Sequence, residues 1–319
     1  MRIRDTCCLA LVALTGVVAC ARTPAAFPTV RPAPPRAVVP ETLSVRTAAG
    51  ISAMGLEDYV LGSVLAEVSP VNETAAATEH IFEIQAVIAR TYATSRLGRH
   101  RDEGFDFCST THCQVFDPAR LATSRFAAVA RAAVERTAGR ILTYGARPVE
   151  ALFHSDCGGV TASADTVWGG PAVPYLRAQA DDVPEPAHRT WRFEASAAAV
   201  RDALAADART NVGRTLARIE IATTDASGRA SELTLSGERA LTVRGDTLRA
   251  VLNRRFGDRA IQSTRLSITR AGTRYVFEGT GFGHGVGLCQ RGAAARVRRG
   301  DPVPDILRAY YPGTTLQKP

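Results

Sequence analysis

Three segments of the 319-residue chain carry side chains whose types and spacing could do chemistry. The first, Cys108-Ser-Thr-Thr-His112-Cys113, brings two thiols and an imidazole within six residues. Thiolates and neutral imidazoles are the ligands of a tetrahedral zinc site, and His100 is close enough along the chain to be a fourth ligand. The two cysteines could equally form a short disulfide, and a nucleophilic Cys113–His pair is a third interpretation. The spacing does not distinguish a metal site from a disulfide, and it favours either of these over a catalytic cysteine.

The second and third segments are rich in glycine. The segment FHSDCGG, residues 153–159, lacks the G-x-S-x-G turn of a serine hydrolase, which indicates a structural loop. The segment GTGFGHGVG, residues 279–287, contains five glycines but not the Lys-Ser/Thr ending of a phosphate-binding loop. Its glycines predict a close approach of the backbone to a ligand or to a neighbouring strand, and His284 within it is a candidate functional histidine.

A single carboxylate stands out on the helix expected over residues 56–68, where apolar residues recur at helical spacing. Glu67 lies at the end of this helix, between Ala66 and Val68. Burial there would raise the pKa of its carboxyl and make it a general acid at neutral pH, whereas a solvated helix end would leave it an ordinary surface group. The residues by themselves favour the solvated helix end.

The first nineteen residues predict export. Arg2 and Arg4 precede an uncharged run that is too short for a permanent membrane helix, as in a signal peptide over residues 1–19. The residues VVAC, ending at Cys20, fit the cleavage site of a bacterial lipoprotein, in which Cys20 is lipidated and anchors the chain to a membrane. Ordinary secretion with an incidental cysteine is the alternative. Either way the chain is expected in the cell envelope, which argues against a nucleic-acid partner.

The composition is that of a globular protein with a basic surface. Hydrophobic residues make up 45% and charged residues 22%, which excludes a disordered or multi-span membrane chain. The net charge is +8, or +7 without the signal peptide, and Lys318 is the only lysine. Such a surface suits a polyanion, for example an acidic glycan. Two disulfides or a set of metal ligands could come from the four cysteines that follow Cys20, namely Cys108, Cys113, Cys157 and Cys289.

The elements that must position these residues mix helices and strands without a regular βαβ rhythm, so we expect an α+β fold with mostly antiparallel strands. Residues 20–42 contain six prolines and predict an extended tether to a folded domain over residues 43–316. Helices are expected at 56–68, 79–97, 118–137, 196–206 and 246–255, with two short ones at the C-terminal end. Strands are expected at 141–144, 148–154, 217–223, 230–236, 241–244, 265–270 and 274–279.

Together these segments resemble the SpoIID/LytB family, which comprises stage II sporulation protein D and the amidase enhancers. The motifs that carry the resemblance are LEDYVLGSVLAE (56–67), QAVIARTYA (85–93), TTHCQ (110–114), FHSDCGG (153–159) and GFGHGVGLCQRGA (281–293). Shorter matches stand at 168–169, 174–176 and 310–313. Their order and approximate spacing are kept from about residue 43 to residue 316.

The resemblance implies a SpoIID-like catalytic domain and a lytic transglycosylase that acts on peptidoglycan strands whose stem peptides an amidase has removed. Such an enzyme cleaves the MurNAc–GlcNAc linkage and leaves 1,6-anhydroMurNAc ends. Glu67 matches the family's catalytic glutamate. One carboxyl suffices as acid and then base, because the 6-hydroxyl of the sugar attacks in place of water. The basic charge suits the free lactyl carboxylates of such strands.

The resemblance also implies the remaining site residues. Some family members hold zinc near the TTHC loop, which favours a structural zinc over a disulfide among the four cysteines. Its expected ligands are Cys108, His112 and Cys113, with His100 or Cys157 completing the set. The side chains expected to position the glycan are Gln114, His154, His284 and Gln290.

This chain departs from the usual family pattern in three places. Residues 72–78 are the expected insertion between Glu67 and the next motif, Glu83 stands where relatives commonly carry lysine, and Cys289 stands where they commonly carry serine. The alternative function is a non-catalytic glycan-binding module that recruits or stimulates an N-acetylmuramoyl-L-alanine amidase. That function would survive the loss of Glu67. A zinc hydrolase is a more remote third interpretation.

Overall fold

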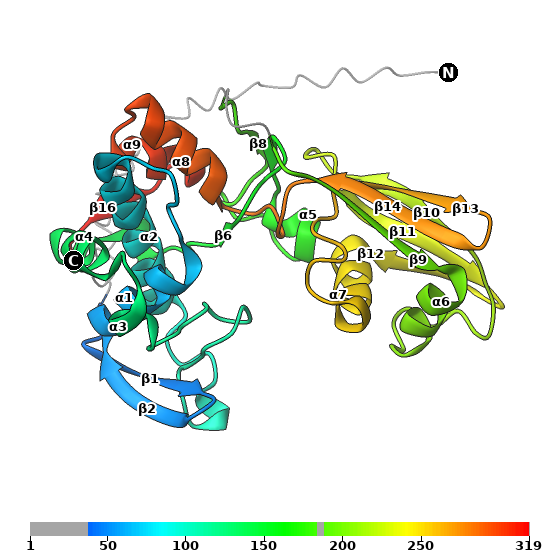
Figure 1. The fold of residues 1–319 in the computed structure, drawn as a ribbon, viewed down its shortest axis with the longest axis horizontal. Coiled ribbons are helices and arrows are strands. Elements are labelled where there is room, and N and C mark those ends of the chain that lie inside the picture. The colour runs from blue at the N-terminus through cyan, green and yellow to red at the C-terminus, as the bar shows by residue number, and fades with distance from the viewer. Residues whose placement is uncertain (1–37, 184–187, 319) are drawn as a thin grey trace, which may run out of the picture. The chain divides into compact units, whose positions relative to one another are not determined.

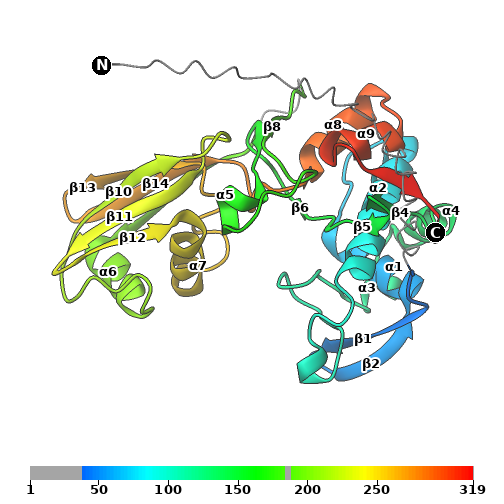
Figure 2. The ribbon, with the colours of Figure 1, turned by 180° about the vertical axis from the view of Figure 1, so that it is seen from behind.

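The structure, a computed structural model, describes residues 38–183 and 188–318 (Figures 1 and 2). The predicted signal peptide, Cys20 and nearly all of the predicted tether therefore lie outside the described residues. The described part contains nine α-helices and mostly antiparallel sheets, which confirms the α+β prediction. Among the described helices, none combines the length and hydropathy that a membrane span requires.

The helices mostly follow the apolar periodicity of the sequence. They are α1 (Leu56–Glu67), α2 (Ala75–Ser95), α3 (Arg120–Thr123), α4 (Ala127–Arg136), α5 (Ala164–Trp168), α6 (Ala197–Ala205), α7 (Gly245–Phe256), α8 (Gln290–Arg299) and α9 (Val303–Tyr310), with a 3-10 turn at Arg101–Glu103.

The prediction of a single helix at 118–137 is wrong, because α3 and α4 are separated at residues 124–126. Ser124 has an extended backbone, and its hydroxyl accepts a hydrogen bond of 3.2 Å from Phe126 N. The break lets the Phe126 ring pack against the edge of Phe82 on α2.

The strands form small sheets. They are β1 (Thr42–Thr47), β2 (Gly50–Gly55), β3 (Phe107–Cys108), β4 (Ile141–Tyr144), β5 (Arg147–Pro148), β6 (Phe153–His154), β7 (Val160–Thr161), β8 (Gln179–Ala180), β9 (Thr190–Ser196), β10 (Leu216–Thr224), β11 (Ala230–Gly237), β12 (Ala240–Arg244), β13 (Leu266–Ala271), β14 (Arg274–Thr280), β15 (Leu288–Cys289) and β16 (Thr315–Gln317). The sheet orders are β2-β1-β3, β10-β11-β12, β13-β14-β9, β15-β6, β16-β4-β5 and β7-β8. The expected strand at 148–154 is interrupted, since β5 and β6 belong to different sheets.

Three hydrophobic clusters stabilise the described residues. The first joins α1, one face of α2, α4 and the loop that carries Phe105 and Phe116. The second joins the opposite face of α2 to β4, to residues 149–164 and to residues 286–311. The third lies within residues 191–277, between the sheets of β9–β14 and the helices α6 and α7. Since α2 contributes to two clusters, it is buried on both sides and fixes α1 and α8 on either flank (Figures 1 and 2).

The glycine-rich segment 279–287 runs against the FHSDCGG segment, which confirms the close backbone approach that its composition predicts. Leu288 and Cys289 of β15 pair in parallel with Phe153 and His154 of β6. Gly287 has a φ of +73°, and a Cβ there would lie 2.0 Å from the carbonyl oxygen of Leu152. Only glycine fits such a position. The neighbour that the glycines approach is therefore a strand of this chain.

Candidate functional site

The helix α1 brings Glu67 to the wall of a cavity. The helix is buried along most of its length and ends at Glu67, after which Val68 has an extended backbone. Glu67 Oε1 accepts a hydrogen bond of 2.7 Å from Val115 N. Burial raises the pKa of Glu67 to about 7, although the Val115 amide acts in the opposite direction. The carboxyl therefore keeps its proton near neutral pH, which a solvated helix end would not allow.

The cavity beside Glu67 has a volume of about 350 Å³. Its walls come from the end of α1 with the following loop, from α2, and from the β15–α8 segment. The polar side chains that line it besides the two glutamates are Ser69, Gln85, Ser155, Gln290, Arg291 and Arg298. Of the residues predicted for the site, Glu67 and Gln290 meet in this cavity.

A pair of amides crosses the cavity wall between α2 and α8. Gln290 Nε2 donates to Gln85 Oε1 at 3.3 Å. Gln85 Nε2 is buried and has no hydrogen-bond partner among the described residues, so it remains available to an oxygen atom of a ligand. Gln85 lies in a family motif but was not among the predicted site residues. A buried glutamine on an otherwise apolar helix face was the signal that could have identified it.

The two acidic side chains of the cavity have different partners. Glu73 Oε1 lies 2.5 Å from Arg298 Nη1 in an ion pair. Glu67 makes no ion pair with any described residue and accepts its hydrogen bond from a backbone amide. Burial raises the pKa of Glu67 and favours its protonated form. Of the two glutamates in this cavity, Glu67 is therefore the candidate for acid–base chemistry.

Three of the side chains expected to position glycan lie outside the cavity lining. Gln114 is only 1% exposed and donates to Ala89 O at 3.2 Å, within the first hydrophobic cluster. His154 is buried on β6, and its ring lies 5.6 Å from the ring of His284, which is half-buried beside Trp168. The structure thus brings the two histidines together but does not bring either to Glu67. Burial lowers the pKa of both, to about 3 for His284, so both rings are neutral at pH 7.

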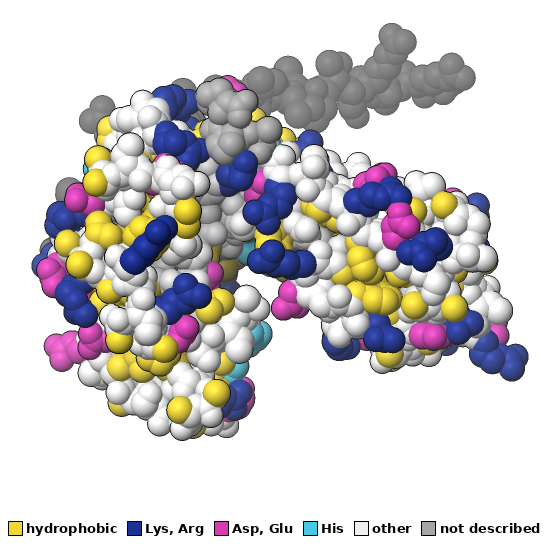
Figure 3. Space-filling model, in the orientation of Figure 1, with side chains coloured by type: hydrophobic (Ala, Val, Ile, Leu, Met, Phe, Trp, Pro, Cys, Tyr) yellow, Lys and Arg dark blue, Asp and Glu magenta, His cyan; other side chains and the backbone are white. Residues whose placement is uncertain are grey.

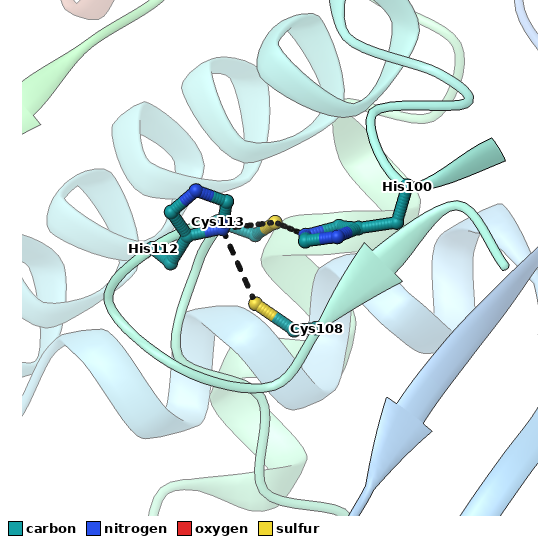
Figure 4. Close-up of side chains that lie close together, drawn as sticks. All are labelled: His100, Cys108, His112 and Cys113. Carbon is teal, nitrogen blue, oxygen red and sulfur yellow. Dashed lines mark hydrogen bonds between the residues drawn. The ribbon is translucent and has the colours of Figure 1, made fainter. Parts of the chain in front are cut away.

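The predicted metal ligands His100, Cys108, His112 and Cys113 converge in one place (Figure 4). Cys113 Sγ lies 3.4 Å from His100 Nε2, and His112 Nδ1 lies 3.7 Å from Cys108 Sγ and 3.8 Å from Cys113 Sγ. The edges of a tetrahedron with zinc–nitrogen and zinc–sulfur bonds are roughly 3.4 to 3.8 Å long. The three distances therefore fit a tetrahedral zinc site, and all four ligand atoms lie within 4.8 Å of one another.

The surroundings of the two thiols and of His100 suit the same site. His100 Nδ1 lies 2.5 Å from Glu103 Oε1, which directs the other ring nitrogen toward Cys113 and is the usual arrangement behind a metal-bound histidine. Burial raises the pKa of Cys108, but hydrogen bonds with Thr110 and His112 outweigh it and lower the pKa to about 6. Burial raises the pKa of Cys113 to about 11, which does not suit a catalytic nucleophile.

Cys157, the other fourth ligand considered, lies elsewhere. It is grouped with His154 and Cys289, not with the TTHC loop. All four described cysteines are free thiols in the structure.

The loop that carries the metal ligands also holds Glu67. Val115, which donates to the Glu67 carboxyl, follows Cys113 by two residues. Phe116 stacks on Tyr59 of α1 with ring centroids 5.4 Å apart. A Cβ at Gly62 would lie 2.4 Å from the Phe116 ring, so glycine lets this loop lie flat on α1. The predicted metal ligands of the TTHC loop and the amide that contacts the Glu67 carboxyl therefore lie at the two ends of one short segment.

Comparison with known proteins places part of this chain in a family. The family described as stage II sporulation protein (SpoIID) matches residues 45–144, which include Glu67, Gln85 and all four predicted ligands of the TTHC loop. The chain is 30% identical over 192 residues to the stage II sporulation protein D of Bacillus subtilis, and 26% identical over 279 residues to the amidase enhancer of the same organism. Residues 45–144 therefore form a SpoIID family domain. The prediction drawn from the five motifs is confirmed.

The alignments cover part of this chain and part of each relative. The alignment with the Bacillus subtilis stage II sporulation protein D covers 58% of this chain and 50% of the relative, and that with the amidase enhancer covers 73% and 37%. This chain therefore spans half or less of the length of these two curated relatives. A protein of Brachyspira hyodysenteriae is 28% identical over 272 residues, covering 83% of this chain and 67% of the relative. A second family, described as a domain of unknown function (DUF8618), matches residues 182–287.

Proposed function

We propose that this protein is a lytic transglycosylase that cleaves peptidoglycan glycan strands, with Glu67 as its acid and base. The observation that carries the proposal is a carboxyl with a pKa of about 7 at the wall of a polar cavity. Such a group is protonated often enough at neutral pH to donate a proton and ionised often enough to take one back. Membership of the SpoIID/LytB family supports a role at the cell wall.

The geometry suits a reaction with one carboxyl. Val115 N holds Glu67 Oε1, which leaves Oε2 to carry the proton. In the first step the carboxyl donates this proton to the oxygen that links MurNAc to GlcNAc. In the second the carboxylate accepts the proton of the MurNAc 6-hydroxyl while that oxygen bonds to C1 and closes the 1,6-anhydro ring. The reaction activates no water molecule and so needs no second carboxylate. Glu73 can therefore remain in its ion pair with Arg298.

The cavity wall suits a glycan that carries carboxylates. The amides of Gln85 and Gln290 match the hydroxyl and N-acetyl groups of amino sugars, and Arg291 and Arg298 place positive charge beside Glu67. Over the face shown in Figure 3, basic and acidic side chains are interspersed. The attraction for a lactyl carboxylate therefore comes from α8, and not from a uniformly basic surface. This supports strands from which the stem peptides have been removed.

A zinc ion at His100, Cys108, His112 and Cys113 is part of the proposal. When bound there, it would supply a cross-link between the turn after α2 and the TTHC loop. The four protein ligands would leave no position for a water molecule, so the site is structural. The contribution of these residues to the reaction is to hold Val115, and through it the Glu67 carboxyl, in place. The alternative, a Cys108–Cys113 disulfide, would fix the same loop without the two histidines.

The proposed location is the cell envelope, with a lipid on Cys20 as the anchor to a membrane. The support is the sequence of the first twenty residues together with the family membership. A cell-wall amidase is the proposed partner in the sense that its product is the substrate of this enzyme.

Replacement of Glu67 is the decisive test. We expect Glu67→Gln to lower the rate of glycan cleavage by about a thousand-fold, because glutamine keeps the hydrogen bond from Val115 but has no proton to transfer. The full chain would be incubated with amidase-treated peptidoglycan, and 1,6-anhydroMurNAc products would be counted by mass spectrometry. Glu73→Gln is the matched control in the same cavity and should keep most of the activity. Full activity in Glu67→Gln would refute the proposal.

A second candidate function is stimulation of an amidase without cleavage. It is favoured by the alignment with the amidase enhancer of Bacillus subtilis, which covers 73% of this chain. The same experiment separates the two functions. A stimulator would bind the strands and release no anhydro products. Its wild-type form and its Glu67→Gln variant would raise the rate of an added amidase to the same extent.

A further inference from the structure

A second cluster of metal-binding side chains lies between the FHSDCGG segment and the start of α8. One ring nitrogen of His154 and the sulfur atoms of Cys157 and Cys289 lie within 4.8 Å of one another. The three side chains are 4%, 0% and 0% exposed. They come from two segments 132 residues apart, which the parallel pairing of β6 with β15 brings together. The proposed glycan cleavage uses none of the three.

The ring of His154 is oriented as a ligand. Its Nδ1 lies 3.2 Å from the carbonyl oxygen of Val286, which requires a proton on Nδ1. The lone pair is then on Nε2, which is buried and has no hydrogen-bond partner among the described residues. A buried polar atom left without a partner costs about 1–3 kcal/mol, and such atoms are rare in native proteins. A carbonyl behind Nδ1 with a lone pair on Nε2 is the usual state of a histidine that binds a metal.

Backbone amides surround both sulfur atoms. Cys289 Sγ accepts hydrogen bonds from Cys157 N at 3.2 Å and from Gly292 N at 3.3 Å. Cys157 Sγ accepts one from Gly159 N at 3.2 Å. N–H donors directed at sulfur stabilise the thiolate form that a metal requires. Arg229 adds positive charge nearby, since its Nη2 donates to Cys157 O at 2.6 Å.

We propose that His154, Cys157 and Cys289 bind a thiophilic metal ion with a filled d shell, Zn²⁺ or Cu⁺. Two thiolates and one imidazole are soft and borderline ligands that these ions prefer. Binding releases the two thiol protons to solvent and forms two metal–sulfur bonds. Three ligands in a closed site satisfy Cu⁺. Zn²⁺ would need a fourth ligand besides these three side chains, because Asp181, whose Oδ2 accepts a hydrogen bond of 3.3 Å from Cys157 Sγ, does not lie within 4.8 Å of all three ligand atoms.

The ion would fix one wall of the Glu67 cavity. Cys289 is the residue before α8, and Gln290 and Arg291, which follow it, line the cavity. Ser155, between His154 and Cys157, lines it as well. The ion is a cross-link and takes no part in the chemistry of Glu67. The proposal therefore stands or falls independently of the transglycosylase activity.

The test is the metal content of the full chain. The protein would be purified without oxidant, stripped with a chelator, and titrated separately with Zn²⁺ and with Cu⁺ under anaerobic conditions. We expect Cys289→Ser to bind one equivalent less than wild type of at least one of these ions. Serine still caps α8 through Gly292 N, so the variant should fold, which circular dichroism would verify. Cys113→Ser is the matched control, because it removes a ligand of the TTHC site only and should leave the second equivalent in place.

A spectroscopic measurement follows the same thiolates. A cobalt-loaded Cys113→Ser protein should show thiolate-to-cobalt charge-transfer absorption that becomes weaker when Cys289→Ser is added to it. Equal metal content in wild type and Cys289→Ser for both ions would overturn the proposal. A Cys157–Cys289 disulfide found by peptide mapping of protein isolated from its cell envelope would overturn it too.

Discussion

Glu67 acquires its chemistry from two contacts with other parts of the chain. Burial behind the loop 113–116 lets it keep a proton, and one backbone amide from that loop holds one of its oxygens. Neither contact is local, since Val115 is 48 residues from Glu67. This is why the residues around Glu67 favoured a solvated helix end, and why only the family resemblance indicated Glu67 as the candidate catalytic carboxyl.

Glycan cleavage should fall as the pH rises through about 7, because Glu67 then loses the proton that it must donate. Neighbouring groups do not impose the same limit, since His154 and His284 are already neutral throughout this range. The measurement is kcat/KM on peptide-free strands from about pH 5 to about pH 9. A rate that stays constant across this interval would show that Glu67 does not act as the acid.

The same carboxyl should make stability depend on pH. The pKa of Glu67 is raised by folding from 4.5 to about 7, so between these values the unfolded chain releases a proton that the folded chain keeps. Stability must then fall as the pH rises, by up to about 3 kcal/mol in total. Glu67→Gln has no such proton, so urea unfolding should find it as stable as wild type near pH 4.5 and more stable at pH 8. Equal stability at both pH values would contradict the burial of the carboxyl.

Prediction of the other site residues was less complete. Gln290 lines the cavity as expected, and Gln85 was found only from the structure. Gln114, His154 and His284 lie in family motifs but face the interior of the protein, and a role in glycan binding stays a prediction for each. Motif membership does not distinguish side chains that line a cavity from side chains that hold its walls together.

At the scale of elements, the segment from β3 to Val115 connects the proposed metal site to Glu67. Residues His100, Cys108, His112 and Cys113 hold its first half, and Val115 contacts Glu67 from its second half. Disorder in the half that carries the predicted ligands should therefore displace Val115 and the Glu67 carboxyl that it contacts.

Removal of the metal, by a chelator or by Cys113→Ser, should lower kcat by about ten-fold without abolishing cleavage, because the loop loosens but Glu67 remains. The Val115 amide lowers the pKa of Glu67, so its loss should also move the alkaline limb of the pH profile to higher pH. Thr111→Ala, an exposed change in the same loop, is the control. Complete loss of activity in a folded protein would instead indicate a catalytic metal.

Most long elements were predictable because their apolar spacing is regular. The helices expected at 56–68, 196–206 and 246–255 appear as α1, α6 and α7, and the strands β10 to β14 appear within a residue or two of their expected ends. β1, β2 and β9 were missed. β1 and β2 have a largely exposed face and little apolar alternation, so their pairing depends on the hairpin and on β3. The pairing of β6 with β15 joins two-residue strands, which carry no periodicity at all.

At the scale of the whole molecule, the third hydrophobic cluster coincides with the second family match. The cluster lies within residues 191–277 and the match covers residues 182–287. A single domain over residues 43–316 stays a prediction. One of the links between this part and the FHSDCGG segment is Arg229, whose guanidinium donates to Cys157 O and to Val160 O at 2.6 and 2.9 Å.

Arg229→Met should destabilise the protein by about 3 kcal/mol, because methionine fills the space but leaves two buried carbonyl oxygens without donors. Urea unfolding would measure the change. Arg270→Met is the matched control, since Arg270 donates to a carbonyl oxygen at the exposed surface, that of Ala217. A loss of stability as small as that of the control would mean that water replaces the guanidinium at Cys157 O and Val160 O.

The double burial of α2 has a consequence for the order in which the chain is made. One face of the helix, with Phe82 and Ala89, is covered by residues that are synthesised next to it. The other face, with Ile81, Ile84 and Ile88, packs against residues 142–176 and also against residues 286–311, which are synthesised much later than α2. Until residues 286–311 are made, part of this isoleucine face stays uncovered in the nascent chain. A chaperone that binds apolar helices should therefore bind the nascent chain until α8 and α9 have been made.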